Sequence, residues 1–506
     1  MIIKNMKIRR MAALIVALTL ASAILFACGD SEPVRAPENG EAPEVADING
    51  EAAVEPAETE PTFARLPAVD YGGADFVIIN LAGFDWIDVT LHVEEELGDM
   101  LSSEIWLRNR AIEDKFNVNI SVIDVQTGQI ATRVRNALRA GDEAFDILQE
   151  SISWGPLAAL AVENYIADAN RLVSLDLANP WWDAFAHEST SILGKNFFLF
   201  GDFTIADKEY ATVIFFNKDM QADYHLPDFY QLVRDGNWTV DTMLESMRVA
   251  TVDLDGDGRW TAADQYGLIT NVHSQFMLFY GAGQTIIRKD SDDRPYFAAG
   301  SEEFVNAFVR MWEFMNTDNT TAEAFALGTH QDTMFANGQA LFNSSLLASI
   351  RGAQDTDFDT FRGVEHGFGI LPPPKLTAAQ ERYYSFLDGI SPAIAIVNNG
   401  TERLERTATV LEALNAKSRE GVQRAYMEHA LPYIFFRDEA SHEMFELIMN
   451  YRVFDLGGIF NWGGFENGLR SLLVRNASPD MASFLDRNLT SAQAAMESDI
   501  ERLLEN

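Results

Sequence analysis

The sequence predicts an α/β protein of two lobes with a helical C-terminal extension. From Ala74 onward, short apolar runs alternate with amphipathic segments of helical period, which is typical of βαβ units around a mostly parallel sheet. Residues 194–219 then hold two short strand-like runs on either side of a polar loop, and a second α/β unit follows. We therefore expect the chain to cross between the lobes at 194–219 and to cross back near 369–374.

The predicted elements are runs of apolar residues bounded by turn-forming residues. Strands are predicted at 74–81, 118–122, 144–150, 196–200, 212–216, 368–374 and 390–397. Helices are predicted at 103–116, at 129–140, at 240–250 after the N-cap Thr239, at 302–315, and over most of 402–505, around a glycine-flanked loop at 457–464. In open sheets of this kind, ligands bind beyond the carboxyl ends of the strands. The residues that follow each strand are therefore the first candidates for a binding site.

The chain is long and strongly acidic. Its 506 residues exceed what one hydrophobic core ordinarily supports, which agrees with two lobes. Its 76 Asp and Glu residues outnumber its 38 Lys and Arg residues, for a formal net charge of −38. Such a surface repels phosphate backbones, so the composition argues against nucleic-acid binding.

The N-terminal residues predict export and attachment to a membrane. Residues 1–27 contain four basic residues, no acidic residue and the apolar run Met11–Phe26, which is shorter than the ~20 residues of a membrane span and fits a signal peptide. The sequence Leu25-Phe26-Ala27-Cys28 resembles the bacterial lipobox, in which the cysteine is lipidated, and Cys28 is the only cysteine of the chain. We expect fatty acyl chains such as palmitate on Cys28 to hold the protein at the extracellular face of the cell membrane.

Residues 28–62 predict a lipidated cysteine followed by a flexible tether. Ten acidic residues and five prolines fall within 29–62, where large apolar residues are almost absent. Such a segment cannot bury enough apolar surface to offset the conformational entropy lost on ordering, so it is expected to be disordered and extended. Folded structure is therefore expected from residue 63.

Residues 253–264 match the spacing of an EF-hand-type calcium loop. Such a loop takes oxygen ligands from positions 1, 3 and 5, a glycine at position 6, a backbone carbonyl at position 7 and a carboxylate at position 12. The sequence DLDGDGRWTAAD fits this pattern, with Asp in place of the usual Glu at position 12. The predicted metal-site residues are Asp253, Asp255, Asp257, Arg259, Thr261 and Asp264. We expect a structural Ca²⁺ in the second lobe, with a metal-free acidic turn as the alternative.

An ordered set of short motifs resembles the carbohydrate-type (family 1) solute-binding lipoproteins of ABC importers. The likeness rests on the lipobox and on EDKFNV at 113–118, FDIL at 145–148, GK at 194–195, FNKD at 216–219, NGQA at 337–340 and residues 367–373. It implies a type II periplasmic-binding-protein-like fold, in which hinge crossovers join two lobes that close on a ligand without chemical reaction. It also implies a monomer that docks on ABC permease subunits. The long loop between the crossing strands and the extended helical tail depart from the family pattern.

On this resemblance, lobe 1 is expected to comprise residues 63–205 and 369–416, and lobe 2 residues 206–368 and 417–506. A sugar presents C–H faces and hydroxyl groups, so its pocket needs flat aromatic rings and hydrogen-bonding side chains. Asp202, in the loop of the crossing stretch, is the carboxylate that we expect first in the site. The candidate ligand-binding residues, all at expected loop positions, are Phe84, Asp85, Trp86, Glu150, Trp154, Asp202, Tyr210, Asn271, Ser344 and Trp462.

The sequence favours binding over catalysis. It contains no HExxH, GxSxG or Walker A motif, and its one cysteine belongs to the lipobox. Two alternatives stay open. One is a surface lipoprotein that senses or adheres to glycans, and the other is an extracellular glycan-acting enzyme, whose paired carboxylates would be close only in space. Recovery of an unmodified ligand would separate binding from turnover.

Overall fold

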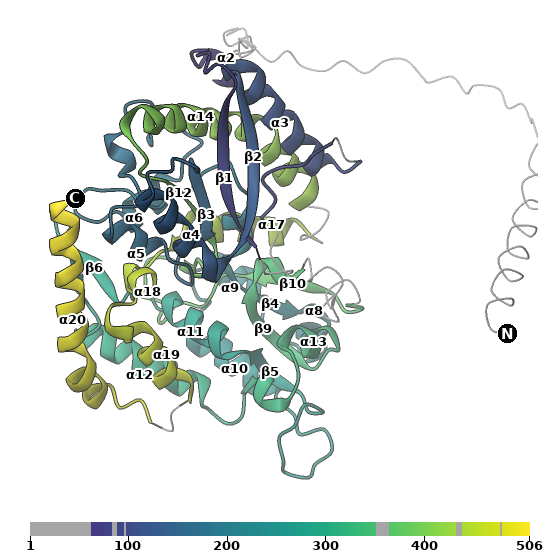
Figure 1. Ribbon diagram of the computed structural model, residues 1–506. Coiled ribbons are helices and arrows are strands. Elements are labelled where there is room, and N and C mark those ends of the chain that lie inside the picture. The colour runs from purple at the N-terminus through teal and green to yellow at the C-terminus, as the bar shows by residue number, and fades with distance from the viewer. Residues whose placement is uncertain (1–61, 83–88, 96–97, 351–363, 432–437, 476–477) are drawn as a thin grey trace, which may run out of the picture. The chain divides into compact units, whose positions relative to one another are not determined.

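Strands and helices alternate along the chain, as the sequence predicts. The computed structural model describes residues 62–82, 89–95, 98–350, 364–431, 438–475 and 478–506, which belong to one compact unit (Figure 1). The predicted signal peptide, Cys28 and almost all of the tether lie outside these residues, as do the candidates Phe84, Asp85 and Trp86. Among the described residues, no helix combines the length and apolar character that crossing a membrane requires.

The first sheet has four strands in the order β12-β3-β1-β2. They are β1 (Ala74–Ala82), β2 (Val118–Gln126), β3 (Ile147–Ser151) and β12 (Pro392–Ile396). β1 is parallel to β2 and β3, whereas β12 is antiparallel to β3. The helices along this part of the chain are α2 (Thr62–Arg65), α3 (Met100–Phe116), α4 (Thr127–Arg139), α5 (Leu157–Val162), the 3₁₀ helix η1 (Ala169–Arg171), α6 (Ala184–Thr190), α7 (Ala206–Glu209), α14 (Thr401–Glu420), α15 (Val422–Ala425) and the π-helix η5 (Tyr426–Ala430).

The second sheet has five strands in the order β10-β4-β9-β5-β8. They are β4 (Thr212–Asn217), β5 (Tyr266–Thr270), β8 (Thr321–Glu323), β9 (Ala340–Leu346) and β10 (Phe368–Leu371). β4 is antiparallel to β10 and β9, and β5 is parallel to β9 and β8. Its helices are α8 (Lys218–Asp223), α9 (Phe229–Arg234), α10 (Val240–Ala250), α11 (Val272–Gly281), α12 (Glu302–Met315), η2 (Ala324–Leu327), α13 (Gln331–Ala336) and η3 (Leu347–Ile350). α10 begins where predicted, because Thr239 and Thr242 form a reciprocal capping box.

Two crossings join the sheets and lie side by side. The first leaves the first sheet at Leu199, which forms an isolated bridge with β12, and enters β4 after Ala211. The second runs from Leu387 into β12. Ala211 bridges Leu387, and Asp388 N donates to Tyr210 O at 3.0 Å. Paired connections of this kind are where a hinge between two lobes can form.

Three details differ from the sequence prediction. The second crossing lies beyond 369–374, because β10 pairs with β4 in the second sheet. Residues 369–371, which we assigned to lobe 1, therefore form hydrogen bonds within the second sheet. The run at 196–200 makes one isolated bridge rather than a strand, since Phe200 N donates to His187 Nε2 at 3.0 Å. Residues 457–464, expected as a loop, fall in the helices α18 and η6, with Asn461 between them.

The C-terminal part of the chain is helical, as expected. It comprises α17 (Glu439–Asn450), α18 (Leu456–Phe460), η6 (Trp462–Gly464), α19 (Phe465–Arg475) and α20 (Met481–Glu505), which runs to the C-terminus (Figure 1). Two small sheets complete the fold: antiparallel β6 (Ile287–Lys289) and β7 (Pro295–Phe297), and parallel β11 (Ser385–Phe386) and β13 (Arg452–Val453). The β11–β13 pair joins the segment before the second crossing to the C-terminal helices.

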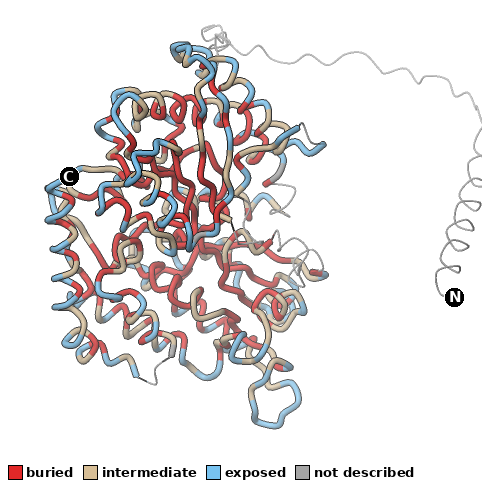
Figure 2. The backbone as a smooth tube through the Cα atoms, in the orientation of Figure 1, coloured by how far each residue is buried: buried red, intermediate tan, exposed pale blue. Residues whose placement is uncertain are grey.

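Figure 2 shows the buried residues concentrated along the strands of both sheets. Every residue of β3 and β4 is buried, as expected for strands that are covered on both faces. Trp238 is 0% exposed, and its Nε1 donates to Pro372 O at 2.9 Å. Trp181 and Trp182 donate to Glu412 at 3.0 and 2.8 Å. These three tryptophans are therefore packing residues, with their polar edges satisfied inside the fold.

Candidate functional site

A pocket of about 340 Å³ lies beside the two crossings. Its walls come from the loop after β3, from the start of α11 with the second crossing, and from the C-terminal segment α18–α19. The lining residues are Ser153, Trp154, His273, Phe386, Gly389, Gly458, Asn461, Glu466, Asn467 and Arg470. The carboxyl end of a parallel strand, β3, therefore leads into the pocket, as in other open α/β sheets.

Trp154 is held at the pocket by the turn that follows β3. Ser151 Oγ accepts a hydrogen bond from Trp154 N at 3.2 Å and donates to Gly389 O at 2.8 Å. Ser153 N donates to the same carbonyl at 2.8 Å, and only glycine permits this approach, because a Cβ on Gly389 would lie 2.6 Å from Ser153 Cβ. The Trp154 side chain stays 51% exposed. The turn thus presents a large, flat apolar ring on which a ligand can stack.

His273, at the start of α11, forms the part of the pocket wall that packs against Trp154. Asn271 Oδ1 caps α11 by accepting a hydrogen bond from His273 N at 2.9 Å. The His273 ring lies edge-on to Trp154, with ring centroids 5.3 Å apart. Its Nε2 lies 2.6 Å from Oδ2 of Asp388, a buried carboxylate in the second crossing. This contact links the start of α11 to one of the connections between the sheets.

α19 adds an ion pair to the pocket wall. Glu466 and Arg470 lie four residues apart on this helix and form a salt bridge. The Arg470 guanidinium lies 5.5 Å from the ring centroid of Phe276 in α11. Burial raises the pKa of Glu466, while Arg470 and His273 act in the opposite direction. The C-terminal helices therefore supply charged hydrogen-bonding groups to a pocket whose other wall is aromatic.

Ser153, His273 and Asp388 are the residue types of a hydrolase triad. A nucleophilic serine needs a base within hydrogen-bond reach. All three residues belong to the described part of the chain, and no hydrogen bond in it joins the Ser153 hydroxyl to His273. The contact that activates a serine nucleophile is therefore not made among the described residues.

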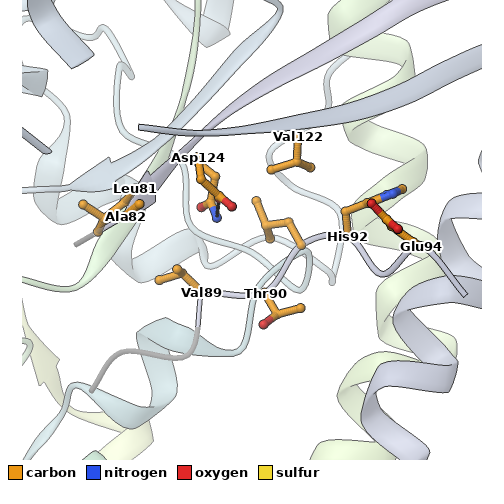
Figure 3. A pocket seen from close by; sticks show the side chains of 10 residues that line it. Leu81, Ala82, Val89, Thr90, His92, Glu94, Val122 and Asp124 are labelled. Atoms are coloured by element: carbon orange, nitrogen blue, oxygen red, sulfur yellow. Dashed lines mark hydrogen bonds between the residues drawn. The ribbon is translucent and has the colours of Figure 1, made fainter. Parts of the chain in front are cut away.

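A second pocket, of about 420 Å³, lies at the carboxyl ends of β1 and β2 (Figure 3). Its lining residues are Asn80, Leu81, Ala82, Val89, Thr90, Leu91, His92, Glu94, Val122 and Asp124. Two of its polar groups bond to each other, with Asn80 Nδ2 donating to Asp124 Oδ1 at 2.9 Å. Gln149 Nε2, from outside the lining, donates to Asn80 Oδ1 at 3.0 Å. The described lining includes no Trp, Tyr or Phe, and residues 83–88, which join Ala82 to Val89 and contain Phe84 and Trp86, lie outside the described residues. The pocket beside Trp154 is the one whose described lining offers an exposed aromatic ring.

Two of the ligand residues predicted from sequence are brought together at the 340 Å³ pocket. Trp154 lines it, and Asn271 caps the helix that carries His273 into it. Asp202 lies elsewhere, with Oδ2 accepting a hydrogen bond from Arg419 at 3.1 Å and Oδ1 lying 3.9 Å from Lys208 Nζ.

The remaining described candidates are buried within the fold. Glu150, Tyr210 and Ser344 are fully buried in or beside strands. Trp462 is buried too; it stacks on Phe460 and donates from Nε1 to Asp499 Oδ2 at 2.9 Å. These four residues therefore do not line the 340 Å³ pocket.

Several pocket residues were missed by the sequence analysis. His273 stands two residues after the predicted Asn271, so the helix cap was a usable signal for it. Asn461 belongs to the glycine-flanked segment that was singled out for Trp462. Glu466 and Arg470 had no distinguishing signal, because an acid and a base at i and i+4 are common on solvated helix faces.

The acidic loop 253–264 has part of the geometry of a cation site. Carboxylate oxygens of Asp253, Asp255 and Asp257 all lie within 4.8 Å of one another. Asp264 is not in this group: its oxygens accept hydrogen bonds from two backbone amides, at 3.0 and 2.8 Å, and the bond from Thr261 N lowers the Asp264 pKa. The three clustered carboxylates fit a hard cation such as Ca²⁺, with Asp264 bracing the loop.

Two sheets joined by paired crossings, with a pocket against those crossings, define the two-lobed periplasmic-binding-protein-like fold. The model of the family described as bacterial extracellular solute-binding protein matches residues 108–406, which is more than half of the chain. The protein therefore belongs to the family of bacterial extracellular solute-binding proteins.

Solved structures agree with this fold. A cyclo/maltodextrin-binding protein complexed with maltotetraose matches with a TM-score of 0.51 and 12% sequence identity, over 86% of this chain and 97% of that chain. A sugar transporter from Rhizobium etli in an open conformation matches with a TM-score of 0.51 and 14% identity, over 85% of this chain and 99% of that chain. At these identities the likeness establishes the fold alone. No curated protein matches the chain.

Proposed function

We propose that this protein captures a sugar or oligosaccharide in the pocket beside the crossings and delivers it to an ABC importer. The observation that carries the proposal is the half-exposed Trp154 ring, surrounded by the polar side chains of His273, Asn461, Asn467 and Arg470. A stacking surface ringed by hydrogen-bonding groups suits a saccharide. Membership of the solute-binding family supports this reading, as does the sugar-related description of both compared structures.

The remaining parts of the proposal concern where and how the protein acts. It is a monomer held at the extracellular face of the cell membrane by the lipid on Cys28 and a tether of residues 29–62. It docks on ABC permease subunits after its lobes close on the ligand, and it releases the ligand unchanged. An acidic surface and the absence of a basic patch in the sequence fit a small-molecule ligand better than nucleic acid.

Calorimetric titration against a panel of oligosaccharides tests the binding site. We expect Trp154→Ala to weaken binding of the sugar that the wild type takes by at least tenfold, or ~1.4 kcal/mol, because the stacking surface is lost. Tyr296→Ala is the matched control, since Tyr296 is a 46% exposed ring on β7 outside the pocket lining. Asp202→Ala is a companion variant; because Arg419 and Lys208 hold Asp202, we expect its affinity to stay within twofold of wild type.

Two results would overturn the proposal. Unchanged affinity in Trp154→Ala, with the variant folded, would remove the pocket assignment. Recovery of a cleaved or otherwise altered sugar after incubation would replace binding with glycan turnover. Tight binding without uptake by an associated permease would instead favour a glycan sensor or adhesin.

We also propose that the loop 253–264 binds Ca²⁺ as a structural ion of the second lobe. The clustered carboxylates of Asp253, Asp255 and Asp257 support this, because three like charges within 4.8 Å repel one another until a cation neutralises them. Added Ca²⁺ at 100 times its Kd should raise the free energy of unfolding by about 2.7 kcal/mol. Thermal unfolding with EDTA and then with Ca²⁺ measures this. Asp255→Asn should lose the response, and an equal melting temperature in both conditions would leave the loop as a metal-free turn.

A further inference from the structure

The polar groups of the pocket beside Trp154 are arranged with the nitrogen-bearing side chains of Arg470 and His273 in front and carboxylates behind. The side chains of Arg470 and His273 are 22% and 24% exposed, whereas those of their partners Glu466 and Asp388 are 7% and 0% exposed. A ligand that enters the pocket therefore meets nitrogen-bearing side chains before it meets the carboxylates. Nitrogen-bearing groups face the ligand at this pocket, although the chain as a whole has a formal net charge of −38.

Arg470 has unused capacity to donate hydrogen bonds. A guanidinium group carries five N–H donors in a planar fork. Nη2 of Arg470 donates to Glu466 Oε1, and Nε is buried without a hydrogen-bond partner among the described residues. Buried donors that lack a partner are unfavourable, and a shift of the Arg470 side chain toward a ligand oxygen would satisfy this one. A carboxylate is the oxygen group that matches the guanidinium fork best.

The start of α11 adds a second, independent preference for negative charge. The helix runs from Val272 to Gly281, and its second residue, His273, lines the pocket. The N-terminal end of a helix carries partial positive charge from its aligned peptide dipoles. The N-terminal end of α11 and the guanidinium group of Arg470 therefore both favour a negatively charged ligand group placed between them.

We propose that this pocket is selective for an acidic saccharide, with Arg470 binding the carboxylate of a uronic acid residue while Trp154 stacks on a sugar ring. The inference rests on the proposed function and adds its substrate class. Glu466 tunes the preference, because it competes with the ligand for Arg470. Glu466 and Arg470 lie beyond residue 406, where the family match ends, so this selectivity belongs to the C-terminal segment of this chain.

The test compares two ligands with the same sugar backbone, a trigalacturonate with charged carboxylates and its fully methyl-esterified, uncharged form. Calorimetric titration of the wild type should give at least tenfold tighter binding of the acid than of the ester. Arg470→Gln should lower the affinity for the acid at least tenfold, to the level of the ester. Glu466→Gln should tighten binding of the acid several-fold, because it frees Arg470 from its partner while keeping the side chain's shape.

Arg234→Gln is the matched control. Arg234 also pairs with a glutamate, Glu443, but this pair is exposed and lies outside the pocket lining, so neither affinity should change. Thermal unfolding checks that each variant is folded, and Glu466→Gln decides the question alone if Arg470→Gln does not fold.

The outcomes separate this inference from the proposed function. Equal binding of acid and ester, tighter binding of the ester, or weaker binding of the acid by Glu466→Gln would overturn the acidic substrate class while leaving a sugar-binding protein. Binding of neutral saccharides with no binding of either probe would do the same. A failure to bind any saccharide, neutral or acidic, would overturn both.

Discussion

Asp146 and Glu466 are both buried carboxylates that pair with arginine, but their surroundings differ. Asp146 precedes β3 and is fully buried. Its oxygens accept hydrogen bonds from Arg403 at 2.9 and 2.8 Å, from Thr407 at 3.0 Å and from Val77 N at 2.8 Å. All of these partners belong to the first sheet and α14. Both oxygens of the Asp146 carboxylate are thus engaged within the fold, and they tie β1 and the start of β3 to α14.

Glu466 belongs to a group that lies at a pocket. Its partner Arg470 lines the pocket and keeps a buried Nε without a hydrogen-bond partner among the described residues. A carboxylate paired with an arginine therefore has two different roles in this chain. Arg406 Nε in the Asp146 group is also buried without a partner among the described residues, but it does not line the pocket beside Trp154. The Asp146 carboxylate therefore fixes the fold, whereas the Arg470 donors lie at a pocket and are available to a ligand.

The largest expected effect comes from breaking the Asp146 group. Asp146→Ala leaves Arg403 and Arg406 without their shared carboxylate and Val77 N without its acceptor. Removing one partner of a buried ion pair costs about 3–5 kcal/mol, because the remaining charge stays desolvated. We expect the free energy of unfolding, measured by urea titration, to fall by this amount.

Glu443→Ala is the control for that prediction, since Glu443 forms an ion pair with Arg234 in which both side chains are exposed. Exposed pairs contribute about 0.2–1 kcal/mol. If both variants lose the same small amount, the contrast between the Asp146 and Glu466 groups is wrong, and Asp146 would be no more structural than a surface carboxylate.

Much of the fold could be predicted from the sequence because its cause is local. The strands at 74–82 and 212–217 are runs of β-branched and aromatic residues, and α10 begins at a Thr that caps it. The second crossing was placed too early because β10, an apolar run before three prolines, forms ladder bonds with β4, which lies about 150 residues earlier. Strand pairing over such a separation leaves no local pattern.

The candidate site was less predictable for the same reason. Trp154 follows a strand, so the rule that ligands bind at carboxyl ends finds it. Trp462 has an equally favourable sequence context, yet Asp499, on a helix close to the C-terminus, satisfies its indole and buries it. Arg470 looks like a solvated helix residue until α19 is packed against α11. Which aromatic and charged groups stay uncovered is decided by tertiary packing.

Asp455 extends the comparison to a buried carboxylate without a cation. It accepts hydrogen bonds from Ile286 N at 2.6 Å, Ile287 N at 3.2 Å and Gly457 N at 2.8 Å, and no Lys, Arg or His of the described residues forms an ion pair with it. Burial raises the pKa of Asp455 to about 6, although these amides act in the opposite direction. Unlike Asp146, it has backbone amides and the Tyr280 hydroxyl in place of a cation, and it holds the start of α18 near the pocket.

A raised carboxyl pKa makes stability depend on pH in a definite direction. The folded protein binds the Asp455 proton more tightly than the unfolded chain, whose pKa is near 3.8, so this group's contribution to stability is highest below about pH 4 and falls as pH rises to about 6. The full change is about 3 kcal/mol for a shift of about two units. Asp455→Asn does not titrate, so the difference in unfolding free energy between wild type and variant should decrease by about 2 kcal/mol of this total between pH 4 and 6 and should be level above about pH 7. A difference that is constant across this range would mean that Asp455 is ionised in the fold like an ordinary surface carboxylate, and that its amide and Tyr280 partners fully offset the cost of burying its charge.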